Sequence, residues 1–150
     1  MHRFALRVRY GDTDQMGFAY YANYLRWFEI GRAELLRALG TSYRAVEESG
    51  VWLPVIEARC RYHRPARYDD LVVIETGVAE LRRAAVRFGY RVTREEGGEL
   101  LAEGTTEHCF TDRAGRPVRP PAALAALLER APRATSSAAP PDPPAGAGER

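Results

Sequence analysis

The sequence contains no lysine, so arginine supplies every basic side chain in a Lys+Arg count of 22. Twenty acidic side chains nearly balance them and leave a formal net charge of +2. A nucleic-acid-binding domain would need a larger and more concentrated basic excess. The composition therefore argues against nucleic acid as a partner, and it makes any single arginine a weak sign of a binding site.

Long hydrophobic runs and paired cysteines are also missing. No stretch reaches the roughly 18 apolar residues of a membrane span, and the N-terminus alternates arginine with apolar residues instead of forming a signal peptide. Cys60 and Cys109 lie in strand-like segments without CxxC spacing, which supports neither a disulfide framework nor a zinc site. We expect a cytoplasmic, soluble protein with no membrane partner, no metal and no redox cofactor.

The common catalytic motifs are absent as well. The sequence has no GxSxG, GxGxxG or GxxxxGK[S/T] motif, and before residue 132 its only serines are Ser42 and Ser49. Three histidines are scattered along the chain. The neighbours His108 and Cys109 fall in a predicted strand, where adjacent side chains point to opposite faces, so they cannot act as a nucleophile and its base.

The length of 150 residues fits one ordinary domain. Residues 132–150 are rich in Ala, Pro, Ser and Gly, and they carry no large apolar side chain to offset the entropy lost on ordering. We predict one domain over residues 1–131 and a disordered tail over residues 132–150.

Two kinds of periodicity divide the domain. Residues 3–10 alternate apolar and polar side chains, as a half-buried strand does. A Gly- and Asp-rich segment follows, and then residues 20–39 form a dense apolar segment that predicts a long helix closed by Gly40. Its apolar positions cover more than a narrow stripe, which predicts burial on several sides. A short helix is expected over residues 42–49.

Strand periodicity dominates the rest of the chain. We predict strands over residues 54–64, 70–81, 84–95 and 99–111, joined by turns into an antiparallel meander. A short closing helix is expected in the segment PPAALAALLER. One strand, a long helix and four further strands define an α+β fold in which the helix covers one face of a mainly antiparallel sheet.

The segment from Tyr10 to Glu29, YGDTDQMGFAYYANYLRWFE, joins a carboxylate-bearing loop to the predicted long helix. It resembles the signature of hotdog-fold acyl-CoA thioesterases of the 4-hydroxybenzoyl-CoA thioesterase-like family. The similarity continues through Arg64-Pro65 to the Gly115-Arg116-Pro117 turn, and so covers residues 3 to about 120. The resemblance implies a five-stranded antiparallel sheet wrapped around the helix of residues 20–39. It also implies an acyl-CoA substrate and a homodimer or homotetramer with its active site at the dimer interface.

The chemistry of thioester hydrolysis fits this segment. The reaction needs a carboxylate that attacks the carbonyl carbon or activates water, and it needs donors for the oxyanion that develops. A helix N-terminus offers unpaired backbone N–H groups and the positive end of the helix dipole. In this sequence these groups fall at Tyr21 and Ala22.

The resemblance assigns the catalytic carboxylate to Asp14, the second aspartate of the motif, while Asp12 would fix the loop through backbone hydrogen bonds. Gly17 would allow close approach of the substrate or a positive φ angle. Some members of the family have histidine where this chain has Tyr21, and Tyr21 resembles the aryl-CoA type instead. We expect Tyr21 to contribute its backbone N–H, with its ring lining the pocket.

Arg82 and Arg83 lie at the predicted turn between two strands. Related thioesterases use basic residues there to hold the nucleotide phosphates of the substrate, often across a subunit boundary, and guanidinium groups match phosphate geometry well.

Two other functions fit the same fold. A hydratase or dehydratase acting on thioesters generally needs an Asp and a His together, and no histidine follows Asp14 in the loop or helix. A non-catalytic acyl-CoA-binding module would be expected to lack Asp14. The sequence therefore favours an acyl-CoA thioesterase, while leaving open the acyl group and the choice between a covalent anhydride and base-activated water.

Overall fold

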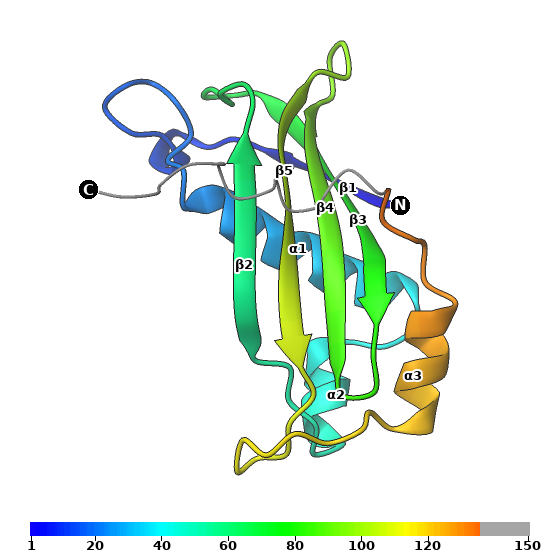
Figure 1. The fold of residues 1–150 in the computed structure, drawn as a ribbon. Coiled ribbons are helices and arrows are strands. Elements are labelled where there is room, and N and C mark those ends of the chain that lie inside the picture. The colour runs from blue at the N-terminus through cyan, green and yellow to red at the C-terminus, as the bar shows by residue number, and fades with distance from the viewer. Residues whose placement is uncertain (136–150) are drawn as a thin grey trace, which may run out of the picture.

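Five strands form one antiparallel sheet in the computed structural model, which describes residues 1–135 (Figure 1). Across the sheet the order is β1-β3-β4-β5-β2. The predicted meander is confirmed for β3-β4-β5 but is wrong for β2, which pairs with β5 instead of β3, while β1 pairs with β3 at the other edge. The strands are β1 (His2–Arg7), β2 (Val55–Tyr62), β3 (Leu71–Leu81), β4 (Ala85–Arg94) and β5 (Leu100–Cys109).

The helices are α1 (Asn23–Ala38), α2 (Tyr43–Glu48) and α3 (Ala122–Glu129), and a single 3-10 turn, η1 (Tyr10–Asp12), follows β1. The long helix thus begins three residues later than the sequence predicts. The reason is a backbone hydrogen bond from Tyr20 N to Asp12 O at 2.8 Å, which holds residues 20–22 in a turn before the helix. The first strand also ends earlier than predicted, at Arg7, because the chain turns into η1 at Tyr10.

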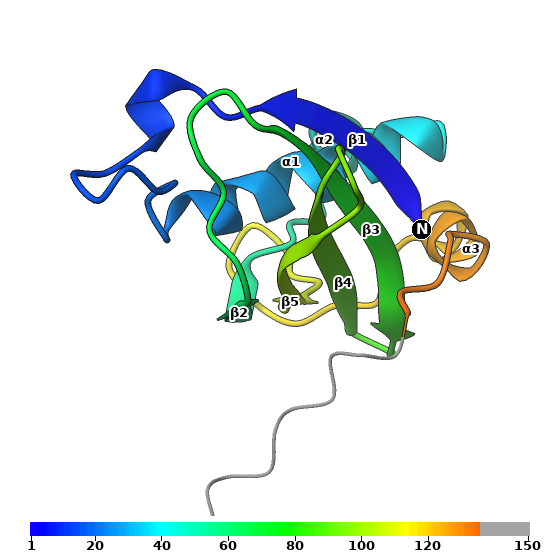
Figure 2. The same cartoon turned by 90° about the horizontal axis from the view of Figure 1, so that it is seen from above.

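The sheet curves around α1, so that the helix lies against its concave face (Figure 2). Within α1 the buried residues recur at helical spacing along one face. They are Asn23, Tyr24, Trp27, Phe28, Gly31, Leu35 and Leu36. Leu25 and the two tyrosines before the helix are exposed. The prediction that this segment is buried on several sides is therefore wrong for the single chain, because the sheet covers only one face.

Gly31 sets the distance between α1 and the sheet. A Cβ atom at this position would lie 2.4 Å from Thr76 Oγ1 and 2.7 Å from Ile74 Cγ2, both on β3. Because such contacts are far below van der Waals distance, any larger residue would push the helix away from β3.

The two sheet edges differ. Among the described residues β2 pairs only with β5, and Val55 and Ile56 on it are exposed. At the other edge β1 covers the first half of β3, and residues 132–134 run beside its second half, where Val78 N donates to Pro132 O and Ala134 N donates to Val78 O. The first residues of the predicted tail thus lie against β3. The rest of that tail, residues 136–150, lies outside the described residues. Within residues 1–135, no helix is long and apolar enough to span a membrane.

Candidate active site

The loop that carries Asp14 is a short hairpin closed by its own backbone. Thr13 and Ala19 form an antiparallel bridge, Asp14 N donates to Phe18 O at 2.8 Å, and Gly17 N donates to Asp14 O at 3.0 Å. Gly17 has φ of +79°, a conformation that glycine adopts at little cost. The predicted positive φ at Gly17 is confirmed, and it gives the loop the tight turn that presents Asp14.

The Asp14 carboxylate is held by one oxygen and leaves the other available. Oδ1 accepts a hydrogen bond from Met16 N at 2.9 Å, while Oδ2 accepts none from any described residue. The side chain lines a pocket of about 340 Å³ that lies beside the start of α1. A partly exposed carboxylate with one unengaged oxygen is able to attack an electrophile or take a proton from water.

Asp12 holds the loop and helix together, as the sequence predicts. Its Oδ2 accepts from Arg9 N at 2.8 Å, and its backbone oxygen accepts from both Tyr20 N at 2.8 Å and Asn23 Nδ2 at 2.7 Å. The first residue of α1 is thereby tied to the loop that carries Asp14. Asp12 fixes the geometry of the site through the backbone.

The turn before α1 offers two unpaired backbone donors. Among the described residues, neither Tyr21 N nor Ala22 N donates a hydrogen bond, and no side chain caps the helix at Ala22. An uncapped helix start concentrates partial positive charge. The structure thus places these N–H groups at the same end of the molecule as Asp14. They lie in the turn before α1, whereas the sequence predicts them within the first turn of the helix.

The pocket walls are largely aromatic and apolar, and they come from three segments: the Asp14 loop, the start of α1 and the end of β2. The lining residues are Asp14, Met16, Phe18, Ala19, Tyr21, Tyr24, Tyr62, His63, Arg64 and Pro65. The rings of Tyr24 and Tyr62 meet edge to face with centroids 5.0 Å apart. Burial raises the pKa of both phenols, so both stay protonated at neutral pH.

Sequence reasoning missed Tyr62 and His63 as pocket residues. Tyr62 O–H donates to the Tyr21 backbone oxygen at 2.9 Å, and His63 Nε2 lies 3.0 Å from Glu103 Oε2. No motif marks them, because they reach the pocket through the pairing of β2 with β5. Only the alternation of β2 could have suggested that one of the two faces inward.

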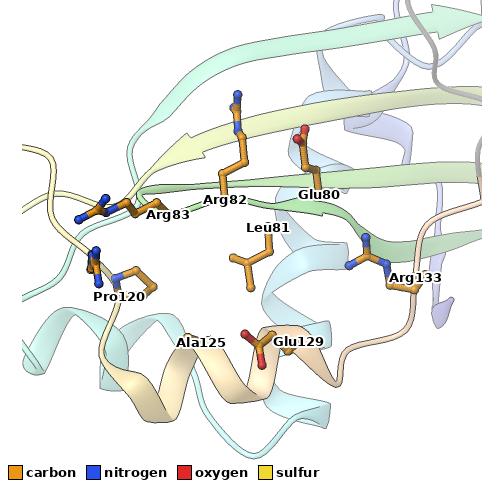
Figure 3. Close-up of a pocket in the computed structure, with 9 residues that line it drawn as sticks. Glu80, Leu81, Arg82, Arg83, Pro120, Ala125, Glu129 and Arg133 are labelled. Atoms are coloured by element: carbon orange, nitrogen blue, oxygen red, sulfur yellow. The ribbon is translucent and has the colours of Figure 1, made fainter.

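Arg82 and Arg83 lie at the opposite end of the sheet from Asp14. They line a separate pocket of about 670 Å³ between the β3–β4 turn and α3, together with Arg119 and Arg133 (Figure 3). Arg82 is paired with Glu107, while Arg83 has no ion pair among the described residues. The 11 residues of β3 that separate this turn from the Asp14 loop span about 35 Å. One chain therefore does not bring these arginines to Asp14.

Within residues 1–135, no three histidine, cysteine, aspartate or glutamate side chains lie close enough together to hold a metal ion.

Comparison with known proteins identifies the family. The sequence profile of the thioesterase-like superfamily matches residues 8–128. Acyl-CoA thioesterase YbgC of Haemophilus influenzae is 39% identical over 110 residues, which cover 73% of this chain and 79% of that protein. The 1,4-dihydroxy-2-naphthoyl-CoA hydrolase of Thermosynechococcus vestitus is 30% identical over 131 residues, or 86% of this chain and 89% of that protein. The crystal structure of DHNA-CoA thioesterase from Staphylococcus aureus has a TM-score of 0.75 and 31% identity, and the match covers 78% of each chain.

A five-stranded antiparallel sheet curved around one long helix is the hotdog fold, which this chain shares with the solved thioesterase structure. The chain belongs to the thioesterase-like superfamily. The fold and family predicted from the Tyr10 to Glu29 motif are therefore confirmed.

Proposed function

We propose that this protein hydrolyses the thioester of an acyl- or aryl-CoA to the free acid and coenzyme A. Asp14 acts as nucleophile or general base, and the N–H of Tyr21 or Ala22 donates to the oxyanion. The observation that carries this proposal is that Asp14 Oδ2 and two N–H groups, none of them hydrogen-bonded within residues 1–135, lie around one loop and helix start. Relatives at 30 to 39% identity named as acyl-CoA thioesterases or hydrolases support the same activity.

The chemistry follows from these groups. In one route Asp14 takes a proton from water, the hydroxide oxygen bonds to the thioester carbon, and the carbonyl becomes an oxyanion held by backbone N–H. Collapse of this intermediate breaks the C–S bond and releases the thiolate of coenzyme A, which takes up a proton. In the other route the Asp14 oxygen itself bonds to the carbonyl carbon and expels the thiolate, and water then hydrolyses the mixed anhydride.

The walls of the Asp14 pocket favour an apolar acyl group. Met16, Phe18 and Tyr24 contribute apolar surface, and the volume of about 340 Å³ lies at the lower end of ligand pockets. Aromatic rings that present both faces and edges suit an aryl group as well as an alkyl chain. The hydrolases of aryl-CoA thioesters among the relatives support including aryl substrates.

Recognition of the nucleotide would require a second copy of the chain. Arg83 carries a guanidinium suited to phosphate that has no ion pair within residues 1–135, but β3 separates it from Asp14. Association through the exposed edge of β2 would continue the sheet into a partner, whose arginines would then complete the site. A homodimer or homotetramer is therefore part of the proposal.

The experiment is thiol release from benzoyl-, phenylacetyl-, hydroxybenzoyl-, short-chain and long-chain acyl-CoAs. We expect Asp14→Asn to lower turnover by orders of magnitude. Asp69→Asn is the matched control, because Asp69 is an exposed loop residue with φ of +68°, a conformation that asparagine also tolerates.

Three outcomes would overturn the assignment. Acyl-CoA binding without turnover would indicate a binding module. Hydration of an enoyl-CoA without thiol release would indicate a hydratase. Equal activity of the two variants would remove Asp14 from the mechanism.

A further inference from the structure

Tyr62, the last residue of β2, joins the sheet to the turn that precedes α1. Its hydroxyl donates to the backbone oxygen of Tyr21 at 2.9 Å, across 41 residues of sequence. The same oxygen also accepts from Tyr24 N, but at 3.4 Å. The phenol of Tyr62 therefore provides the shorter of the two hydrogen bonds that hold this carbonyl.

The carbonyl of Tyr21 and the N–H of Ala22 belong to one planar peptide group, so fixing the oxygen also fixes the direction of that N–H. A hydrogen bond to the oxygen polarises the peptide and strengthens its N–H as a donor. The N–H of Tyr21 belongs to the preceding peptide and is carried by the same residue. Neither N–H has an acceptor among the described residues.

Contacts with two other aromatic rings fix the position of the Tyr62 ring. It meets the ring of Tyr24 at 5.0 Å and the ring of Tyr21 at 6.5 Å, nearly perpendicular to both. The hydroxyl of Tyr24 in turn accepts from Ala66 N at 3.1 Å in the buried interior. β2 is paired along its length with β5, which places Tyr62 opposite Ala102. The donor thus comes from a strand of the sheet, while the turn itself has no side-chain cap.

We infer that Tyr62 is a positioning residue for the oxyanion donors, because its hydroxyl fixes and polarises the backbone of Tyr21. This inference rests on the proposed thioesterase activity. Tyr62 transfers no proton in this role. Its phenol stays protonated at neutral pH because burial raises its pKa, so it remains a donor throughout the reaction.

The test is Tyr62→Phe, which removes the hydroxyl and keeps the ring. We expect kcat to fall roughly fivefold to tenfold, as for the loss of one neutral hydrogen bond, with KM changed less than about twofold because the ring still lines the pocket. The matched control is Tyr68→Phe. Tyr68 is exposed, its ring meets only Tyr10, and its hydroxyl has no hydrogen bond among the described residues. This control should keep wild-type kcat and KM.

A second substitution provides an independent test if the Tyr62→Phe variant does not fold. Incorporation of 2,3,5,6-tetrafluorotyrosine at position 62 preserves the ring and the donor but makes the phenol acidic enough to offset the raised pKa of Tyr62. We expect kcat to decrease at alkaline pH, where the phenolate no longer donates a hydrogen bond. A side chain with a purely structural role would leave the pH dependence of kcat unchanged.

The outcomes separate the inference from the function on which it rests. A wild-type protein that releases no thiol from any acyl-CoA overturns both. An active wild type with unchanged kcat in Tyr62→Phe overturns the inference alone. A lower melting temperature with unchanged kcat, or a rise in KM without a fall in kcat, also overturns it.

Discussion

The ring of Phe28 on α1 stacks on the ring of Tyr90 on β4, with centroids 4.3 Å apart and 6° between the planes. Phe28 is fully buried, and the sheet leaves room for it at Gly104, where a Cβ atom would lie 2.7 Å from Phe28 Cε2. We expect Phe28→Ala to lower the free energy of unfolding by about 3 to 5 kcal/mol, because it removes apolar contact and leaves a cavity. Urea unfolding measures the change.

Leu25→Ala is the control for this effect, because Leu25 lies on the same helix but is 40% exposed. Its cost should stay below about 1 kcal/mol. Similar losses in the two variants would mean that the stacking face does not dominate the packing of α1.

His108 makes the stability of the fold sensitive to acid. It is fully buried, its Nδ1 lies 3.0 Å from Leu53 O, and its Nε2 lies 2.8 Å from Thr106 Oγ1. Because a carbonyl only accepts, Nδ1 carries the proton and Nε2 accepts from the hydroxyl. Burial lowers the pKa of His108 from 6.5 to about 4.

The folded protein therefore resists protonation of His108 more than the unfolded chain does. Its contribution to stability is fully present above about pH 6.5 and is lost as the pH falls toward 4, by about 3 kcal/mol in total. Urea unfolding between pH 7 and 4 should show this loss in the wild type and a flatter profile in His108→Gln. Parallel profiles would contradict the assignment.

Arg83 is expected to contribute to substrate affinity and not to the chemical step. Arg83→Gln should raise KM for CoA thioesters about fivefold, with kcat nearly unchanged and with a smaller difference at high salt. Arg113→Gln, at an exposed turn without an ion pair among the described residues, should have no such effect. Equal shifts in both variants would indicate general electrostatic attraction instead of a phosphate site.

The edge of β2 is the predicted surface of self-association. Ile56 is 59% exposed on a strand whose outer backbone has no partner among the described residues. We expect Ile56→Arg to shift the protein toward monomer in light scattering and to lower its thioesterase activity in parallel. Ala126→Arg on the exposed side of α3 should change neither. A wild-type protein that is already monomeric and active would contradict the proposal that two copies of the chain form the active site together.

The motif around Asp14 could be interpreted from the sequence because its parts are local. The Asp12 contacts, the positive φ of Gly17 and the donors before α1 all fall between Arg9 and Asn23. The helix start was misplaced because the apolar pattern begins at Tyr20, whereas the backbone bond from Tyr20 to Asp12 delays the helix. Apolar periodicity carries no information about such a bond.

The other wall of the pocket could not be predicted in this way. Tyr62 and His63 reach the loop only through the register of β2 against β5, which places Tyr62 opposite Ala102. A shift of one residue would turn Tyr62 to the other face of the sheet. The separation of Arg83 from Asp14 likewise depends on the direction of β3, which a list of motifs does not contain.

The contrast between the two sheet edges has a consequence for how copies of the chain can assemble. β1 is short and its outward positions include Arg3 and Arg7, charges that oppose pairing with another strand. β2 presents the apolar residues Val55 and Ile56. Because only one edge is suited to strand addition, a continued sheet would be a closed pair related by a two-fold axis, and open-ended fibril growth would stop at the arginines of β1.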